Sequence, residues 1–130
     1  MKEVLNMTKT YKISEIAKIT GLSIPTLRYY EKLGLLHPIR NVTNYRVFTD
    51  NDLRWIAFIY RAKATGMSLS KIIDYSRLRE KGDCTILERI NILEEQETIL
   101  QLEQEKIQKH IDFLRNKKKY YTEFLDNTKK

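Results

Sequence analysis

The sequence predicts a mainly α-helical protein, in which a small winged helix-turn-helix head is followed by a long dimerisation helix. Two short helical segments joined by a tight turn at Gly21-Leu22-Ser23 indicate the helix-turn-helix. Turn formers and β-favouring residues between Leu36 and Phe48 indicate a short hairpin, the wing. From Thr85 to the C-terminus the sequence contains no glycine or proline, which indicates one uninterrupted helix.

Size and composition limit the chain to one compact domain with an appendage, or to one small domain. It has 130 residues, and 42% of them are hydrophobic. A chain of this length is too short for two full globular domains. Its single cysteine excludes an intramolecular disulfide framework. No segment resembles a signal peptide, and no apolar run is long enough to cross a bilayer. We therefore expect a cytoplasmic protein that does not bind membranes.

Positive charge is concentrated in the first part of the chain. Residues 1–79 contain 14 basic and 6 acidic side chains, whereas residues 80–130 contain 10 and 11. This asymmetry indicates a cationic head joined to an almost neutral segment with a different partner. The head suits a polyanion such as nucleic acid or an anionic membrane surface, and net charge alone does not choose between them.

These patterns divide the chain into five segments. They are an N-terminal arm (residues 1–10), a winged helix-turn-helix DNA-binding domain (11–80), a linker (81–84), a coiled-coil dimerisation helix (85–126) and a tail (127–130). The linker is placed where Lys81-Gly82-Asp83 interrupts the helical pattern.

Capping residues define the two helices of the helix-turn-helix. Ser14 is expected to cap the first helix, which ends at Gly21. Its expected inward positions are Ile16, Ala17 and Ile19. Ser23 is a cap candidate for the second helix, which covers residues 24–33 and has Pro25 in its first turn.

Two further helices complete the predicted head. Thr49, followed by Asp50 and Asp52 in the first turn, opens the third helix, which ends near Gly66. Its expected buried residues are Leu53, Ile56, Ala57 and Ile59. Ser68 opens the fourth helix, whose apolar positions include Ile72, Ile73 and Tyr75.

The C-terminal helix contains a seam of apolar residues. Thr85 and Glu88 form a capping-box pattern at its start. Alternating steps of four and three residues from Ile86 meet twelve positions, nine of them apolar, which favours a coiled coil over an ordinary surface helix. The predicted dimerisation residues are Ile86, Ile90, Leu93, Leu100, Ile107, Ile111, Leu114 and Tyr121.

The length of this helix predicts that the seam is covered by a second chain. From Thr85 to Leu125 it would be roughly 60 Å long at about 1.5 Å per residue, which is longer than the small head could cover. An intramolecular helical hairpin is the alternative, but no helix breaker after Thr85 allows the chain to fold back.

The second helix is the candidate recognition helix. Arginine can hold a phosphate or a guanine edge with two donors, and tyrosine hydroxyls bind phosphate oxygens. Because Leu27 and Tyr30 share a face at helical spacing, we expect Tyr30 to point inward and Tyr29 outward. The side chains expected to be presented to DNA are Ser23, Thr26, Arg28, Tyr29 and, nearby, Lys32. The polar wing tip between Arg40 and Asn44 suits a phosphate backbone.

Several strings of the sequence carry a family resemblance. They are Ser14-Glu15-Ile16-Ala17, Thr26-Leu27-Arg28-Tyr29-Tyr30-Glu31-Lys32-Leu33-Gly34-Leu35-Leu36, Asn44-Tyr45-Arg46-Val47-Phe48 and Asp52-Leu53. The chain resembles the MerR family of bacterial transcription regulators from Tyr11 almost to its end. It is most similar to the short, stress-responsive subgroup that has no C-terminal effector domain.

The resemblance implies a homodimer with an antiparallel coiled coil and with two heads in successive major grooves. It also implies that an over-long promoter spacer is distorted until RNA polymerase can engage it. DNA-contact roles carry over to Thr26, Arg28, Tyr29 and Arg46. Asn44, which precedes Tyr45, replaces the family's usual glycine, and asparagine tolerates a left-handed backbone. The complete candidate DNA-binding set is Ser23, Thr26, Arg28, Tyr29, Lys32, Arg40, Asn44, Tyr45 and Arg46.

The effector is not identified by the sequence. Arg61 stands where the stress subgroup carries a reactive cysteine. Cys84 matches the first cysteine of metal-sensing members, but no cysteine or histidine follows Leu125, so one chain cannot form a closed thiolate metal site. Cys84 is either a thiol sensor, with its pKa lowered by a helix N-terminus, or an incidental thiol.

An enzyme is excluded, because the sequence contains no phosphate-binding loop, nucleophile elbow or paired-carboxylate motif. No cofactor or metal is expected, and His37 and His110 are expected to face solvent. Two other readings remain open: an architectural DNA-binding protein without an effector response, and a coiled-coil adaptor. The cationic head argues against the adaptor. Its binding to DNA should weaken with salt, because log K falls by about 0.9 per log unit of salt concentration for each phosphate neutralised.

Overall fold

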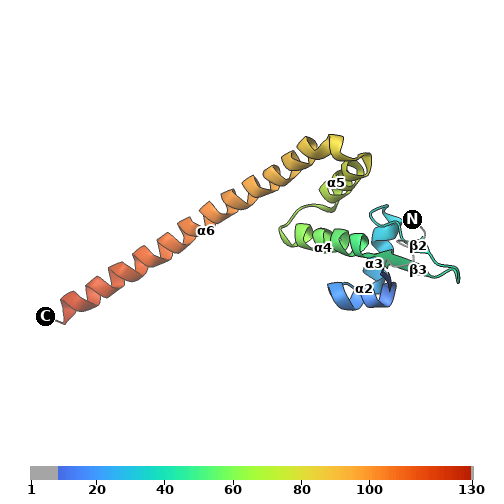
Figure 1. Ribbon diagram of the computed structural model, residues 1–130. Helices are drawn as coiled ribbons and strands as arrows, with labels where there is room; N and C mark the ends of the chain where they lie inside the picture. Colours follow the sequence, from blue (N-terminus) through green and yellow to red (C-terminus); the bar gives the residue numbers. More distant parts are fainter. Residues whose placement is uncertain (1–8, 130) are drawn as a thin grey trace. The chain divides into compact units, whose positions relative to one another are not determined.

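A computed structural model describes residues 9–129 of the chain. The chain divides into two compact units, Met1–Ile90 and Asn91–Lys130 (Figure 1). The elements of the first unit are β1 (Thr10–Lys12), α2 (Ile13–Thr20), α3 (Ile24–Lys32), β2 (Ile39–Arg40), β3 (Arg46–Thr49), α4 (Asp50–Ala64), α5 (Leu69–Lys81) and a 3-10 turn, η1 (Asp83–Thr85). The last helix, α6 (Ile86–Thr128), begins in the first unit and makes up most of the second.

The small sheet has the strand order β1-β3-β2, with both pairs antiparallel. The β2–β3 hairpin is the predicted wing, with Arg40 opposite Arg46 in the register. Strand β1 was not predicted, because three residues are too short for a periodic signal. Only the end of the expected N-terminal arm is described: Thr10 pairs with Thr49, and residues 1–8 lie outside the described residues.

Tyr11 attaches β1 to the rest of the head. Its ring is buried, and its hydroxyl donates a hydrogen bond to Asp50 Oδ1 at 2.7 Å. This hydrogen bond to a carboxylate raises the pKa of the Tyr11 hydroxyl above its ordinary value. The side chain therefore joins β1 to the start of α4.

The core of the head is formed by apolar side chains from the helices and from β3. The largest fully buried ones are Ile16, Leu27, Phe48, Ile56, Ile59 and Ile72. Trp55 is also buried, and its indole N–H donates to the Leu35 carbonyl oxygen at 2.8 Å. Among the described residues, every buried side-chain polar atom has a hydrogen-bond partner. Such a core fixes the positions of α3 and the wing.

Three predicted helix starts are confirmed by their side-chain hydrogen bonds. Ser23 accepts from the Thr26 amide, Thr49 forms a capping box with Asp52, and Ser68 accepts from the Lys71 amide. The expected Ser14 cap is wrong, since α2 follows β1 directly and Lys12 occupies the N-cap position. There the Glu15 side chain accepts from the Lys12 amide at 3.0 Å.

Several inward positions were also predicted wrongly. Ile19 is 56% exposed, Ala57 is exposed, and Leu53 is only half-buried. In α4 the buried positions are taken by Trp55, Ile56, Ile59 and Ala62. The buried stripe of α4 is set by the elements that pack on it, which helical spacing alone does not identify.

The junction before α6 is a compact turn. The Thr85 hydroxyl does not cap α6, because η1 runs directly into that helix. It lies 2.6 Å from the Leu78 carbonyl oxygen and 2.8 Å from that of Gly82, and it accepts from Arg89 Nε at 3.2 Å. Thr85 therefore binds the end of α5 to the start of α6.

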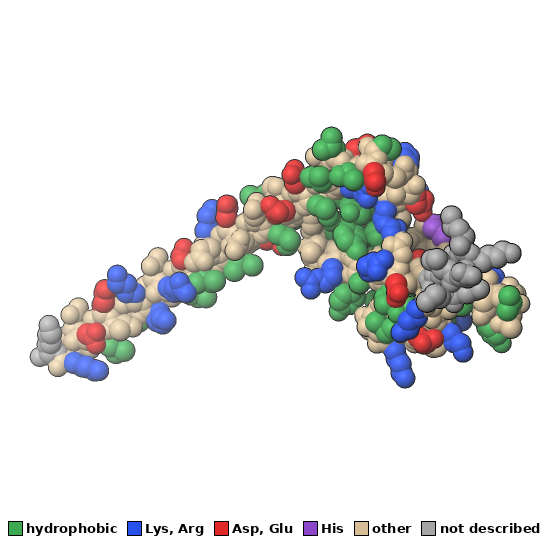
Figure 2. All heavy atoms as spheres, in the orientation of Figure 1, with side chains coloured by type: hydrophobic (Ala, Val, Ile, Leu, Met, Phe, Trp, Pro, Cys, Tyr) green, Lys and Arg blue, Asp and Glu red, His purple; other side chains and the backbone are tan. Residues whose placement is uncertain are grey.

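The long helix is confirmed as one uninterrupted element. It covers Ile86–Thr128 and contains no buried residue. Hydrophobic side chains lie at intervals along it, between charged ones (Figure 2). The exposed fractions of the predicted seam residues run from 36% at Ile111 to 64% at Leu114. Within residues 9–129, no helix combines the length and the apolar character needed to span a membrane.

Candidate nucleic-acid interface

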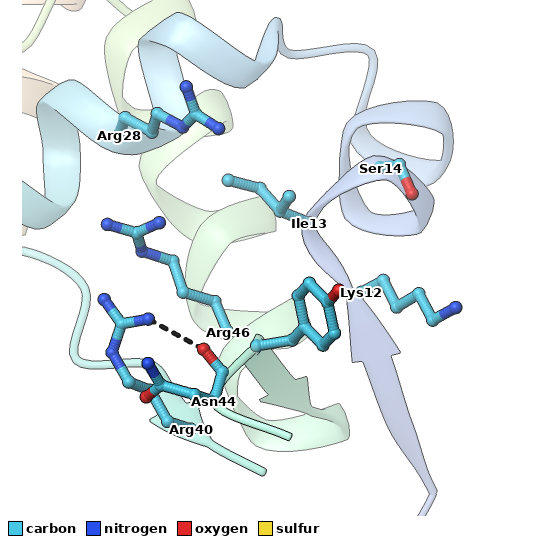
Figure 3. Close-up of a pocket in the computed structure, with 8 residues that line it drawn as sticks. Lys12, Ile13, Ser14, Arg28, Arg40, Asn44 and Arg46 are labelled. Carbon is cyan, nitrogen blue, oxygen red and sulfur yellow. Dashed lines mark hydrogen bonds between the residues drawn. The ribbon is translucent and has the colours of Figure 1, made fainter.

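A cationic hollow lies between α3, the wing and the β1–α2 junction. It has a volume of about 450 Å³. The residues that line it are Lys12, Ile13, Ser14, Arg28, Arg40, Asn44, Tyr45 and Arg46. Figure 3 shows the guanidinium groups of Arg28, Arg40 and Arg46 on the same side of the hollow, whereas Lys12 extends away from them. Three arginines from three elements thus converge on one surface.

Arg46 joins the wing to the candidate recognition helix. Its Nε donates to Glu31 Oε2 at 2.8 Å, and both side chains are about 70% shielded from solvent, with exposed fractions of 31% and 28%. A planar guanidinium can make this contact with one edge and still present its terminal N–H groups to another acceptor. The ion pair therefore fixes Arg46 in the hollow without using all of its donors.

The wing tip is held by a network of local hydrogen bonds. The Asn41 side-chain oxygen accepts from the Thr43 amide and hydroxyl and from the Tyr45 amide. Arg40 Nη1 donates to the Asn44 carbonyl oxygen at 3.0 Å, the dashed line in Figure 3. Asn44 has a φ of 64°, so the left-handed backbone expected at this position is confirmed. The loop is thereby preorganised.

The outward face of α3 agrees with the predicted orientation of its tyrosines. Tyr29 is 50% exposed, whereas Tyr30 is 3% exposed. The exposed hydroxyls of Ser23 and Thr26 lie 2.8 Å apart at the start of the helix. These hydroxyls, Tyr29 and Lys32 lie on α3 or its cap but do not line the hollow.

Three residues that line the hollow, Lys12, Ile13 and Ser14, are not among the predicted DNA-binding residues. The structure brings together five of the predicted residues, Arg28, Arg40, Asn44, Tyr45 and Arg46, and adds these three from the β1–α2 junction. Pairing of β1 with β3 carries Lys12 to the wing, opposite Val47. In the sequence, Lys12 is a basic residue just before the first helix. Without the pairing of β1 with β3, nothing in the sequence places it near the wing.

Residues 11–78 match the family described as MerR HTH family regulatory protein. The match covers more than half of the chain. The chain therefore belongs to the MerR family. This confirms the resemblance stated from the sequence, and it agrees with the exclusion of an enzyme, because the relatives are named as transcriptional regulators.

Individual relatives support this MerR assignment. An HTH-type transcriptional regulator of Haemophilus influenzae is 35% identical over 86% of this chain and 84% of its own length. The HTH-type transcriptional regulator AdhR of Bacillus subtilis is 40% identical, but the match spans only 62% of this chain and 59% of AdhR.

A solved MerR structure has the same fold over most of this chain. It is HiNmlR, described as a MerR family regulator lacking the sensor domain and bound to promoter DNA. It superposes with a TM-score of 0.69 at 35% identity and covers 80% of each chain.

The candidate sensor and the two histidines lie outside the hollow. Cys84 is exposed in η1, and its Sγ lies 3.7 Å from the Lys81 carbonyl oxygen. His110 is exposed, and His37 is exposed but hydrogen-bonded to Glu80 at 2.8 Å. Within the described range, no group of three or more His, Cys, Asp or Glu residues could hold a metal ion.

Proposed function

We propose that this MerR regulator binds double-stranded promoter DNA through the cationic hollow and the exposed face of α3. The observation that carries the proposal is the convergence of Arg28, Arg40 and Arg46 beside a helix of the helix-turn-helix. Guanidinium groups bind phosphates and guanine edges with two parallel hydrogen bonds. HiNmlR, which has the same fold, is described as bound to promoter DNA.

The candidate residues divide into two groups by position. Thr26, Arg28 and Tyr29 on α3 would face the major groove, with Ser23 and Lys32 at the two ends of the helix. The wing would lie on the flanking backbone, where its contacts fix register without reading bases. Its contact residues are Arg40, Asn44, Tyr45 and Arg46.

We further propose that the protein acts as a homodimer through α6. The seam residues from Ile86 to Tyr121 are all at least 36% exposed. A long exposed apolar stripe is unfavourable in water, and a second copy would cover it. The antiparallel arrangement of the two helices follows from the family resemblance.

Two heads on one dimer would allow the regulator to distort an over-long promoter spacer for RNA polymerase. Bending a site of this size costs on the order of 1–6 kcal/mol. Contacts from both heads would offset that cost. An architectural protein would also bind DNA, but it would show little sequence preference and no effect on transcription.

Quantitative footprinting on the DNA upstream of the protein's own gene tests this function. We expect a protected site and, with RNA polymerase added, a change in transcript yield. Arg28→Ala should weaken binding by about 5- to 150-fold, because a bidentate arginine contact contributes roughly 1–3 kcal/mol. Arg77→Ala is the matched control, since this exposed arginine on α5 does not line the hollow.

Two results would contradict the proposal. Equal protection of unrelated sequences without a change in transcription would favour the architectural reading. Normal binding by the Arg28→Ala protein would remove Arg28 from the contact set.

The same assay tests Cys84 as a thiol sensor. If Cys84 is the sensor, an electrophile or oxidant should change the footprint of the wild type and leave that of Cys84→Ser unchanged. The thiol is exposed and can be reached by such reagents. The same response in both proteins, or none in either, would assign the thiol no sensing role.

A further inference from the structure

A second hollow in the head is lined by three arginines and three aromatic rings. Arg54, Trp55 and Phe58 come from α4, Tyr75 and Arg79 from α5, and Arg89 from the first turns of α6. All six belong to the unit Met1–Ile90. Its volume is about 210 Å³, and it shares no residue with the DNA-facing hollow. The DNA-binding function makes no use of it.

The aromatic residues form a fixed wall. The Phe58 ring stacks on Trp55 at a centroid distance of 5.4 Å and on Tyr75 at 4.8 Å, with interplanar angles of 11° and 22°. The Trp55 N–H is already bonded to the Leu35 carbonyl oxygen, so the indole cannot rotate away without losing that bond. Figure 2 shows hydrophobic side chains gathered between α4 and α5, with Lys or Arg side chains beside them.

Two of the arginines are held in place while part of their donor capacity stays unused. The Arg79 guanidinium carbon lies 4.5 Å from the centre of the Trp55 ring. A guanidinium that stacks by its face leaves the N–H groups at its edge available. Arg89 donates from Nε to Thr85 and from Nη2 to the Gly82 carbonyl oxygen at 3.1 Å, and its side chain is only 17% exposed. Its Nη1 group is not used by these bonds.

In the part of the chain that the structure describes, one long ion pair, between Arg89 and Asp83, opposes the positive charge of this hollow. The acidic oxygen paired with Arg89 is Asp83 Oδ1, which lies 4.0 Å away on a side chain that is 99% exposed. Within the described part of the chain, Arg54 and Arg79 form no ion pair or side-chain hydrogen bond. Like charges around one small hollow repel one another, and an oxyanion bound between them would remove that repulsion.

We propose that this second hollow binds a small molecule through an oxyanion group, a phosphate or a carboxylate, held by Arg54, Arg79 and Arg89. The planar guanidinium groups match the geometry of both anions. The aromatic wall forms an apolar side against which the carbon skeleton of an organic anion can pack. Bound there, the ligand contacts α4, α5 and the start of α6 together.

The proposal is tested with Trp55, the only tryptophan of the chain, as an internal fluorescent probe. The full-length protein is titrated with inorganic phosphate in one arm and with benzoate in the other, against sodium chloride at matched ionic strength. We expect a saturable change in Trp55 emission with at least one of the two anions and none with chloride. The preferred anion identifies the oxyanion class. No DNA is present, so failure here leaves the DNA-binding proposal untouched.

Arg54→Gln is the decisive variant, because Arg54 is exposed and its removal leaves the core and the α5–α6 junction intact. We expect its apparent affinity for the anion to fall about tenfold, the loss of one charge-assisted hydrogen-bonding group. Arg77→Gln, on α5 but outside the hollow, should titrate like the wild type. Circular dichroism checks that each variant is folded.

Four results would overturn the proposal. One is an emission that stays unchanged with both anions, and another is a response that chloride reproduces. The third is equal affinity in the wild type and Arg54→Gln. The fourth is an anion response that appears only when the protein is diluted into monomers. It would indicate that, in the dimer, a carboxylate of the second copy occupies the hollow.

Discussion

At the scale of single residues, Arg46 shows how one side chain can serve both the fold and the site. Its Nε is bonded to Glu31 on α3, while the rest of the guanidinium lies in the cationic hollow. The family resemblance predicts a DNA contact for Arg46, but it does not predict the pairing of Arg46 with Glu31. An ion pair between residues on separate elements leaves no periodic signal in the sequence.

This double role predicts that lysine cannot replace Arg46. A lysine keeps the charge but lacks the planar fork, so it cannot contact Glu31 and a phosphate in the same geometry. We expect Arg46→Lys to lower operator affinity roughly tenfold, measured by fluorescence anisotropy. The slope of log K against log salt should stay close to that of the wild type, because the charge is unchanged. Unchanged affinity would show that the charge of Arg46 alone matters.

At the scale of elements, the Asn41 side chain holds the wing tip together by hydrogen bonds. Its side-chain oxygen accepts three hydrogen bonds across the tip, from Thr43 and Tyr45. Asn41→Ala would remove them all and leave a loose loop. We expect operator affinity to fall by about fivefold, since the wing would then lose conformational freedom on binding.

Val42→Ala is the matched control for the wing, because Val42 lies fully exposed in the same tip and is not among the candidate DNA-contact residues. It should bind DNA like the wild type. Both proteins are compared in the same anisotropy assay. An Asn41→Ala protein with full affinity would show that the wing need not be preorganised.

A second element-scale prediction concerns the α5–α6 junction. The Leu78 carbonyl belongs to the last turn of α5, where carbonyls lack an intrahelical partner, and the Thr85 hydroxyl satisfies it at 2.6 Å. Thr85→Val should lower the free energy of unfolding by about 1–3 kcal/mol. Urea denaturation at fixed protein concentration measures this change.

The control for Thr85 is Thr122→Val on α6, where an exposed hydroxyl donates to Lys118. It should change stability by less than about 0.5 kcal/mol. Equal effects of the two substitutions would mean that the buried hydroxyl of Thr85 contributes no more than an exposed one.

The elements themselves could largely be predicted from the sequence, since caps and breakers are local signals. Ser23, Thr49 and Ser68 each start the expected helix. Strand β1 and the exposure of Ile19 could not be predicted in this way, because they depend on which elements pack together. The same limit applies to the hollow, whose Lys12 reaches the wing only through the pairing of β1 with β3.

At the scale of the whole molecule, the net positive charge and the exposed apolar seam lie in different parts of the chain. Residues 1–79 have 14 basic against 6 acidic side chains, whereas the apolar seam lies on α6. In the proposed homodimer each head would present one recognition helix, so that a single head could read only half of a two-fold symmetric site. DNA affinity should therefore depend on α6, although none of the candidate DNA-binding residues lies on it.

Breaking the seam tests this dependence. Leu100→Asp combined with Ile107→Asp places carboxylates at two central seam positions, where a second helix would bury them without partners. We expect a monomer by size-exclusion chromatography and analytical ultracentrifugation, with a folded head by circular dichroism and greatly weakened operator binding. The control is Ile99→Asp with Leu102→Asp, which changes two neighbouring exposed apolar residues outside the seam spacing and should leave the dimer intact. A dimer that survives the seam substitutions would refute the predicted interface, and a monomer that still binds the operator at full affinity would show that one head is sufficient.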